Sequence, residues 1–493
     1  MNNPILFVTL FSLLFYATQV EALHEEGALC IKEAFLDQHH LQVAQNLNEL
    51  GQLYTIRGHY NQAQGLLERA LCIKENLLGE YHLQTAQSLN ELGQLYRIQG
   101  KYNQAQALLE RALCIRETLL GKQNLLVTQS LNELGQLYRI QGQYNQAQAL
   151  LERALYLRET FLDPKHPKVA ETLNELGKLY YEQGQYAQAL SVLERALTLR
   201  EAAFEQQPIQ VAESIHELAR LYYRLCSQYA QTQSMLERAL ALRKTFLGEQ
   251  HPLVAQSLHE LAVMHRIQGH YTQAYPLFKK ALNIKIRQLG EQHPEVAETL
   301  DSFAELYKFK GNSPQAKRFY ERAVAIRKKT LGETHPKVAQ SLLHLANLVI
   351  DQAEYSRAEL LLAQALAILN TTRAQQHPEV LNALFYLALL RYRQTDYTQA
   401  QALLEHIIEP QKQVWGATHP LVAYSLNALA LVYVSQGDYL SAKALLEQTL
   451  DILKKRFDAH HRHVVIVSEN YATLLSEKEA SRGEGNETHI RRE

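Results

Sequence analysis

Histidine is the residue type in this chain with the clearest capacity for chemistry, since imidazole binds metals and exchanges protons near neutral pH. The sequence holds 21 histidines. Six of them precede proline in copies of one short joint: His166, His251, His293, His335, His377 and His419. Residues copied at a fixed interval lie along a ridge, whereas a metal needs ligands that converge on one ion. We interpret these histidines as structural helix caps and expect no metal or other cofactor, although the run His460–His463 has slightly more claim to one.

Other signatures of catalysis are missing from the sequence. It contains no GxSxG, P-loop, HExxH or CxxC motif. Repeated pairs such as Glu110–Arg111 occupy one repeated position and are expected to be surface charges. Cys30, Cys72 and Cys114 also recur every 42 residues, and we expect small apolar core residues at this position. The sequence therefore predicts a protein that is not an enzyme and takes no small-molecule substrate.

The overall charge is balanced. The chain has 50 Lys and Arg against 51 Asp and Glu, a formal net charge of -1. This balance gives no global attraction to nucleic-acid phosphates or to anionic membranes. Nucleic acid is therefore not an expected partner.

A repeat of 42 residues organises the chain and must position any site. The string LNELGQLY begins at Leu47, Leu89 and Leu131, and LNELGKLY begins at Leu173. A fixed period of this length is typical of stacked units that bury apolar surface only against their neighbours. The sequence therefore predicts a solenoid.

One unit, residues 169–200, is predicted to contain two helices. Its first half has apolar and small residues at i, i+3, i+4 and i+7, the pattern of a helix with one buried stripe: Leu173, Leu176, Gly177 and Tyr180. Gly184 can adopt the positive φ that ends a helix, and Pro167 suits a first helical turn. A second stripe follows: Tyr186, Ala189, Leu193, Ala196 and Leu197. Each unit is therefore a helix–turn–helix hairpin, and the fold class is all-α.

These motifs resemble the tetratricopeptide repeat, and in particular its kinesin light chain type. The joints LGEQHPLVA at Leu247, LGEQHPEVA at Leu289 and LGETHPKVA at Leu331 carry the resemblance, with the LNELGQLY body, from about Leu23 to Leu475. The resemblance implies a right-handed superhelix of hairpins. It also implies that the first helix of each hairpin lines a concave groove that binds a peptide or protein.

The repeat count predicts ten complete hairpins. A partial unit that ends near ALCIKE precedes them, and a capping helix at Val464–Leu475 follows. The fifth unit has Cys226 in place of the turn glycine and its tyrosine, Tyr229, one residue late. We expect N-terminal repeats over 23–224, C-terminal repeats with the cap over 225–478, and a disordered charged tail over 479–493.

The N-terminal segment 1–22 is apolar and uncharged from Ile5 to Tyr16, with a small residue at Ala22. This pattern favours a signal peptide or an uncleaved hydrophobic anchor over a degenerate first helix of the repeat. Cleavage would make the protein secreted or periplasmic, and otherwise it would be cytoplasmic. A membrane would be contacted only through this segment.

The predicted groove carries a ladder of carboxamides and a row of cations. The candidate peptide-binding residues are Asn48, Asn90, Asn132, Asn174, Gln94, Gln136, Arg97, Arg139, Lys178, Arg220 and Arg224. Carboxamides can hydrogen-bond both the N–H and C=O groups of an extended peptide, and cations would select acidic side chains. The resemblance implies the same grip for the four asparagines. The only acids expected nearby are Glu182, Glu305 and Asp351.

The asparagine ladder stops after Asn174, where the same position becomes His216, His259, Asp301, Leu343 and Phe385. Leu343, Phe385, Leu389 and Leu431 suggest a less polar partner for the C-terminal half. We therefore expect a non-enzymatic scaffold that binds a protein or an extended, acidic peptide. The alternative is a structural protein that self-associates or spaces the components of an envelope complex.

Overall fold

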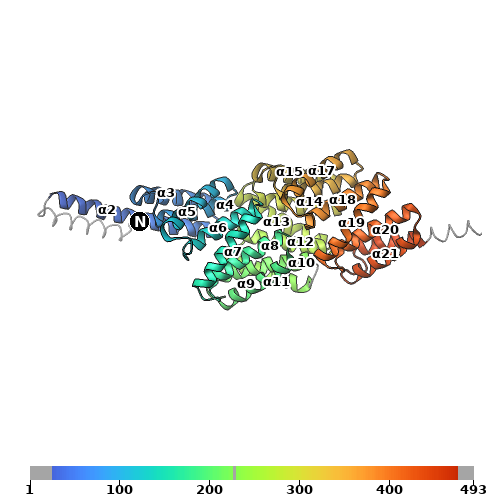
Figure 1. Cartoon of the computed structure of the whole chain (residues 1–493), viewed down its shortest axis with the longest axis horizontal. Helices are drawn as coiled ribbons and strands as arrows, with labels where there is room; N and C mark the ends of the chain where they lie inside the picture. The colour runs from blue at the N-terminus through green and yellow to red at the C-terminus, as the bar shows by residue number, and fades with distance from the viewer. Residues whose placement is uncertain (1–24, 226–228, 476–493) are drawn as a thin grey trace, which may run out of the picture. The chain divides into compact units, whose positions relative to one another are not determined.

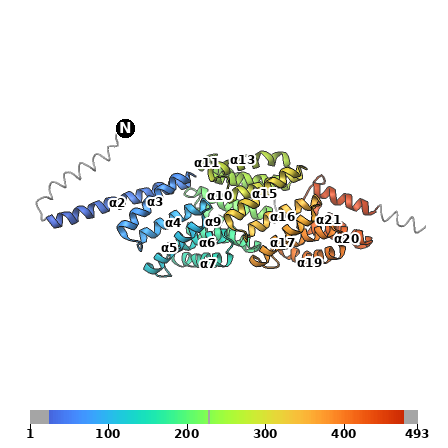
Figure 2. The ribbon, with the colours of Figure 1, turned by 90° about the horizontal axis from the view of Figure 1, so that it is seen from above.

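The computed structural model describes residues 25–225 and 229–475, and every regular element in these ranges is an α-helix. The expected signal segment, the charged tail and the departure at Cys226 lie outside the described residues. Helices pair in sequence order, as Figures 1 and 2 show. The ten hairpins are α2 (Glu25–Ile56) with α3 (Tyr60–Leu78), α4 (Leu83–Ile98) with α5 (Tyr102–Leu120), α6 (Val127–Ile140) with α7 (Tyr144–Phe161), α8 (Pro167–Glu182) with α9 (Tyr186–Ala202), α10 (Pro208–Arg224) with α11 (Tyr229–Leu247), α12 (Pro252–Ile267) with α13 (Tyr271–Leu289), α14 (Pro294–Phe309) with α15 (Ser313–Leu331), α16 (Pro336–Asp351) with α17 (Tyr355–Thr372), α18 (Pro378–Arg393) with α19 (Tyr397–Trp415), and α20 (Pro420–Gln436) with α21 (Tyr439–Lys454). A last helix starts at residue 462 and is described as far as residue 475.

The hairpin turns form where the sequence places them. Gly184 has φ 76°, and its N–H donates to the carbonyl of Tyr181, which ends α8. The left-handed conformation is costly for residues with a Cβ, so glycine is favoured at this position. Two of the described turns have another residue in place of the glycine, and Ala353 (φ 60°) and Thr395 (φ 64°) are held in the same conformation. The turn geometry is therefore retained even where its preferred residue is absent.

The histidines of the joints cap helices, as predicted. The Nδ1 atom of His166 accepts a hydrogen bond from the backbone N–H of Lys168 at 3.1 Å, and Pro167 occupies the first helical turn. His335 caps α16 in the same way through the N–H of Lys337, also at 3.1 Å. Within the described ranges, no three His, Cys, Asp or Glu side chains are grouped to hold a metal.

Two expectations about the N-terminal repeats are wrong. The partial unit does not end before the first hairpin, because α2 is one helix of 32 residues from Glu25 to Ile56. The segment DQHHL between its halves has neither the glycine nor the proline that interrupts later repeats. Cys72 and Cys114 are exposed and are not core residues.

Small residues let the two helices of a hairpin approach closely. A Cβ added to Gly177 would lie 2.5 Å from the Leu193 side chain. Ala189 and Ala196, on the facing helix, are fully buried. The close contact between helices therefore depends on the small residues that the sequence repeats.

The chain divides into two compact units. Unit 1 holds residues up to Ile98 together with Asn103–Lys122, and unit 2 holds Gln99–Tyr102 and the residues from Gln123 onward. The expected boundary at 224/225 falls inside unit 2, between helices α10 and α11, which pack together as an ordinary hairpin. A further division at that point stays a prediction. The site described below is that of unit 2, with unit 1 residues given separately.

Candidate peptide-binding surface

The even-numbered helices of unit 2 form its inner layer, because α6, α8, α10, α12, α14, α16, α18 and α20 each contact the next even-numbered helix. We call the polar side chains that these helices carry between their buried stripes the inner surface. In the part that the candidate residues occupy, its central members are Asn132, Arg139, Asn174, Glu175, Lys178, Glu182, Glu213, Glu217, Arg220 and Glu260.

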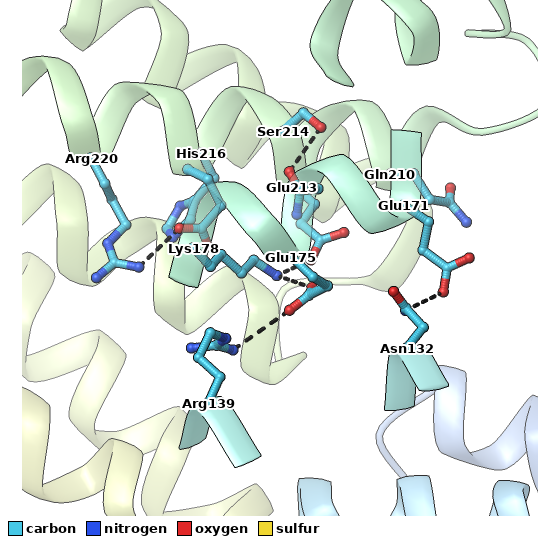
Figure 3. Close-up of polar contacts among 12 residues, drawn as sticks. Asn132, Arg139, Glu171, Glu175, Lys178, Gln210, Glu213, Ser214, His216 and Arg220 are labelled. Carbon is cyan, nitrogen blue, oxygen red and sulfur yellow. Dashed lines mark hydrogen bonds and ion pairs between the residues drawn. The ribbon is translucent and has the colours of Figure 1, made fainter. Parts of the chain in front are cut away.

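The four candidate asparagines are all buried, with exposures of 0 to 1%. In unit 2, Asn132 donates from Nδ2 to Oε1 of Glu171 at 2.9 Å (Figure 3), and Oδ1 of Asn174 accepts from the hydroxyl of Ser214 at 3.1 Å. In unit 1, Oδ1 of Asn48 accepts from the hydroxyl of Ser88 at 3.2 Å. These amides therefore connect neighbouring repeats to each other.

A buried arginine is linked to the asparagine side chain through a serine hydroxyl. Arg200, 2% exposed, donates to the hydroxyl of Ser214 at 2.8 Å and to the carbonyl of Gln210 at 2.8 Å. Ser214 in turn donates to Asn174, so the three side chains form a chain of hydrogen bonds. The same arrangement recurs with Arg327, Ser341 and Asp301, at 2.8 and 2.7 Å.

Sequence reasoning missed this chain of contacts, although a signal for it exists. In four hairpins of unit 2, an Arg near the end of the second helix precedes a Ser or Thr by 14 residues: Arg158 and Thr172, Arg200 and Ser214, Arg243 and Ser257, Arg327 and Ser341. Such a spacing between a cation and a hydroxyl, copied in several repeats, indicates a buried structural contact.

Three of the four candidate cations of unit 2, Arg139, Lys178 and Arg220, are paired with acids. Arg139 pairs with Glu182 and, at 3.7 Å, with Glu175. Lys178 pairs with Glu175 at 2.7 Å and with Glu213 (Figure 3). The inner surface therefore alternates positive and negative side chains on α6, α8 and α10.

Arg220 continues this network. It lies 2.9 Å from Glu217 and 3.3 Å from Glu260, and its guanidinium carbon is 5.1 Å from the centre of the Tyr181 ring. Tyr223 donates from its hydroxyl to Glu260 at 2.8 Å. Further along, Arg266 pairs with Glu305 and Lys308 with Asp351.

The expectation that few acids face the groove is therefore wrong. The glutamate that follows each asparagine of the LNEL motif lies on the same side, and Glu175, Glu217 and Glu260 are 3 to 7% exposed. Burial alone would raise the pKa of Glu213, but Lys178 and Arg200 outweigh it and hold that pKa far below its usual range. Burial raises the pKa of Glu260 even beside Arg220. The charges are thus neutralised within the chain.

The remaining candidates differ in their surroundings. Gln136 is buried, Arg224 is half-buried and bonds the hydroxyl of Tyr186, and Gln94 and Arg97 of unit 1 are half-buried. The apolar residue Leu343 is 1% exposed and belongs to a core cluster, so its expected place in the groove is wrong. Phe385 and Leu389 are half-buried against another cluster.

The repeats match the family model described as tetratricopeptide repeat over residues 42–118, 126–202, 210–285, 257–329, 310–371 and 379–455. The chain belongs to the tetratricopeptide repeat family. Repeats of this family generally mediate protein–protein interactions, and no catalytic domain accompanies them in the match.

Among solved structures, the chain is similar to the repeats of a putative kinesin light chain of Podosopora anserina, with 29% identity, 42% of this chain and 98% of that chain covered, and a TM-score of 0.34. It is similar to BtubC (BKLC) of P. vanneervenii, with 22% identity, coverage of 47% and 90%, and a TM-score of 0.35. A Rap protein complexed with the competence and sporulation factor shares 16% identity, with coverage of 85% and 99% and a TM-score of 0.51. No curated protein sequence matches the chain.

Within residues 25–225 and 229–475, none of the helices has both the length and the apolar character needed to cross a bilayer.

Proposed function

We propose that the protein is a non-enzymatic scaffold whose inner surface binds an extended, acidic peptide segment of a partner protein. Membership of a family that mediates protein–protein interactions supports the binding role. The groove residues would be the candidate residues on α6, α8 and α10, with Asn132, Lys178 and Arg220 at the centre. The Rap protein, which has the same type of fold, is complexed with the competence and sporulation factor.

The observation that carries this proposal is the incomplete hydrogen bonding of the buried amides. Nδ2 of Asn174 and Oδ1 of Asn132 have no hydrogen-bond partner among the described residues, although both atoms are buried. An unpaired buried amide is costly, about 1–3 kcal/mol for each group. A peptide C=O at Asn174 and a peptide N–H at Asn132 would satisfy both atoms at once.

The acidic preference rests on the cations beside these amides. Lys178 and Arg220 are 14% and 22% exposed, and Glu213, a partner of Lys178, is 31% exposed. A carboxylate of the partner would replace one of the chain's own acids at these cations. Such an exchange between ion pairs gives specificity through charge and weakens as salt rises.

Binding of fluorescent peptides to the purified protein tests the proposal. An extended peptide rich in Glu should bind, and the same peptide with Gln in place of Glu should bind at least about tenfold less tightly. Asn132→Ala and Asn174→Asp should each weaken binding. Asn174→Asp keeps an acceptor for Ser214, as Asp301 does for Ser341, so the repeat contact survives. Asn145→Ala on the exposed side of α7 is the matched control.

Equal binding of both peptides, or of all the variants, would contradict the proposal. A loss of binding in Asn145→Ala as large as in Asn132→Ala would assign the effect to the fold. Circular dichroism of each variant separates the two cases.

A second candidate function, self-assembly, is supported by the exposed end of unit 1. On α2, Leu50, Leu53 and Ile56 are 41, 42 and 56% exposed. The equivalent residues of the next hairpin, Leu92 and Leu95, are 3 and 0% exposed. Light scattering tests this candidate: assembly predicts a mass that rises with concentration, and Leu53→Glu should abolish the rise.

A further inference from the structure

Three of the joint histidines, and His461 42 residues after the last of them, make a second hydrogen bond over a long distance in sequence. Their Nε2 atoms lie 2.8 to 3.1 Å from backbone carbonyl oxygens: His335 and Ile140, His377 and Glu182, His419 and Arg224, His461 and Ile267. Each carbonyl belongs to the last residue of an inner helix, α6, α8, α10 or α12. The separation is 195 residues in three pairs and 194 in the fourth.

The helix cap settles which ring nitrogen carries the proton. A backbone N–H can only donate, so Nδ1 of His335, which receives the N–H of Lys337, must be the unprotonated nitrogen. Nε2 then carries the hydrogen and donates it to the carbonyl of Ile140. A neutral imidazole therefore satisfies a helix start and a helix end at once, and the end carbonyls of a helix have no partner within it.

Close packing accompanies these hydrogen bonds at the hairpin turns. A Cβ on Gly142 would lie 3.1 Å from Cδ of Pro336, and one on Gly184 would lie 2.5 Å from Cδ of Pro378. The proline of one joint therefore rests directly on the glycine of a hairpin turn five hairpins earlier.

Arg373 adds a stronger contact. It donates to the carbonyl of Glu182 at 2.8 Å and to the hydroxyl of Tyr144 at 2.9 Å. Its guanidinium carbon is 4.2 Å from the centre of the Tyr144 ring. One apolar cluster also joins Tyr186 and Leu218 to residues of α18–α21. Unit 2 thus folds back on itself, with the joints of its later hairpins against the turns of its earlier hairpins.

We propose that His335, His377, His419, His461 and Arg373 form a latch that closes unit 2, and that the partner peptide reaches the inner surface when the latch opens. The part concerning the peptide rests on the proposed function, whereas the closure does not. Each histidine contributes one neutral hydrogen bond and Arg373 contributes two charge-assisted ones, all of them between hairpins, so the latch can be released without unfolding any hairpin.

Glu182 connects the latch to the inner surface. Its backbone carbonyl receives His377 and Arg373, while its carboxylate pairs with Arg139. Arg224 is connected similarly, since its carbonyl receives His419 and its side chain bonds Tyr186. A peptide that displaces the partner of Arg139 therefore acts on a residue that also holds the latch.

The buried position of the unpaired amides agrees with a closed state. Nδ2 of Asn174 has no hydrogen-bond partner among the residues that the structure describes and is out of reach of solvent. A peptide can bond this atom only after the inner surface opens. The latch explains how the amide can be both unsatisfied and inaccessible.

A triple substitution His335→Asn, His377→Asn and His419→Asn tests the latch. Asparagine retains a good helix cap but is too short to reach the distant carbonyl. Small-angle scattering should show a larger radius of gyration, and hydrogen exchange should accelerate at Gln141–Gln143, while the helix content stays unchanged. His166→Asn is the matched control, because the hydrogen bond described for its ring is the cap alone.

Tyr144→Phe is a milder variant in case the triple substitution does not fold. It removes the hydroxyl that Arg373 binds and keeps the ring. An unchanged radius and unchanged exchange in folded variants would overturn the latch. Faster association of the acidic peptide with the latch variants supports the link to binding, and an unchanged rate overturns it. If the variants expand but no peptide binds to any form, the latch stands and the proposed function fails.

Discussion

Arg373 holds Tyr144 in two ways, with its guanidinium over the ring at 4.2 Å and a hydrogen bond of 2.9 Å to the hydroxyl, across 229 residues of sequence. The side chain of Arg373 is only 6% exposed. We predict that Arg373→Ala lowers the free energy of unfolding by about 2 kcal/mol, because a buried charge-assisted contact is lost. Urea unfolding followed through the single tryptophan, Trp415, measures it.

Arg357→Ala is the control for that measurement. Arg357 is 41% exposed and pairs with Glu321 at 2.7 Å on the surface. An exposed ion pair contributes about 0.2–1 kcal/mol. Equal losses in the two variants would count against the special role of Arg373.

The stability of unit 2 should depend on pH through the joint histidines. Burial lowers the pKa of His335, His377 and His419 to about 4, from an ordinary value of 6.5. Nearby cations act in the same direction, namely Lys337 on His335, Arg373 on His377, and Arg224 and Arg456 on His419, whereas Glu182 and Glu379 oppose them at the first two.

The unfolded chain binds protons at these sites from about pH 6.5 downward, whereas the folded chain does so only near pH 4. The folded state should therefore lose up to about 1.4 kcal/mol per pH unit for each histidine between these values, with no further loss below. Thermal unfolding from pH 7.5 to 4 measures the slope. The triple asparagine variant should show a smaller slope, and equal slopes would refute the assignment.

Gly184→Ala and Gly248→Ala should differ although both glycines have positive φ. The φ values are 76° and 83°, so each substitution costs about 1–2 kcal/mol for the backbone. At Gly184 the new Cβ would also meet Pro378 at 2.5 Å, whereas nothing lies within 4 Å at Gly248. We predict a clearly larger fall in melting temperature for Gly184→Ala. Similar falls would show that the proline does not rest on the turn.

Ala353→Gly and Thr395→Gly should stabilise the protein. Both residues have positive φ, and glycine removes that strain at the cost of a more flexible unfolded chain. We expect a gain of about 0.5–1 kcal/mol for each. Ala402→Gly on the exposed side of α19 should do the opposite by about 1 kcal/mol. Differential scanning calorimetry measures whether each variant is more or less stable than the original protein.

The hairpins could be predicted from sequence because their signals are local. Gly184 ends a helix through its own φ, and His166 caps the next repeat through an N–H two residues away. The burial of Asn174 could not be derived in the same way. It depends on Ser214, 40 residues on, and on Arg200, which binds that serine.

The contacts of the latch could not be predicted from sequence either, because they join residues much farther apart along the chain. The pairing of His335 with Ile140 depends on how far each repeat rotates and rises, and no single repeat encodes that distance. The acids of the inner surface were missed for another reason. Glu175 is adjacent to Asn174 in sequence, and a strict division of the helix into faces placed it elsewhere, whereas a long side chain reaches the same surface.

The contacts that close unit 2 join positions a fixed number of repeats apart, and not a fixed number of residues apart. His461 meets Ile267 after 194 residues while the other three pairs need 195, because only those three span the extra residue near Cys226. Each repeat with a His-Pro joint and a glycine turn carries both halves of the contact. If such a repeat is duplicated, each histidine can still meet a carbonyl five hairpins earlier, and one further pair forms. The closed form can therefore lengthen in evolution without any new kind of interface.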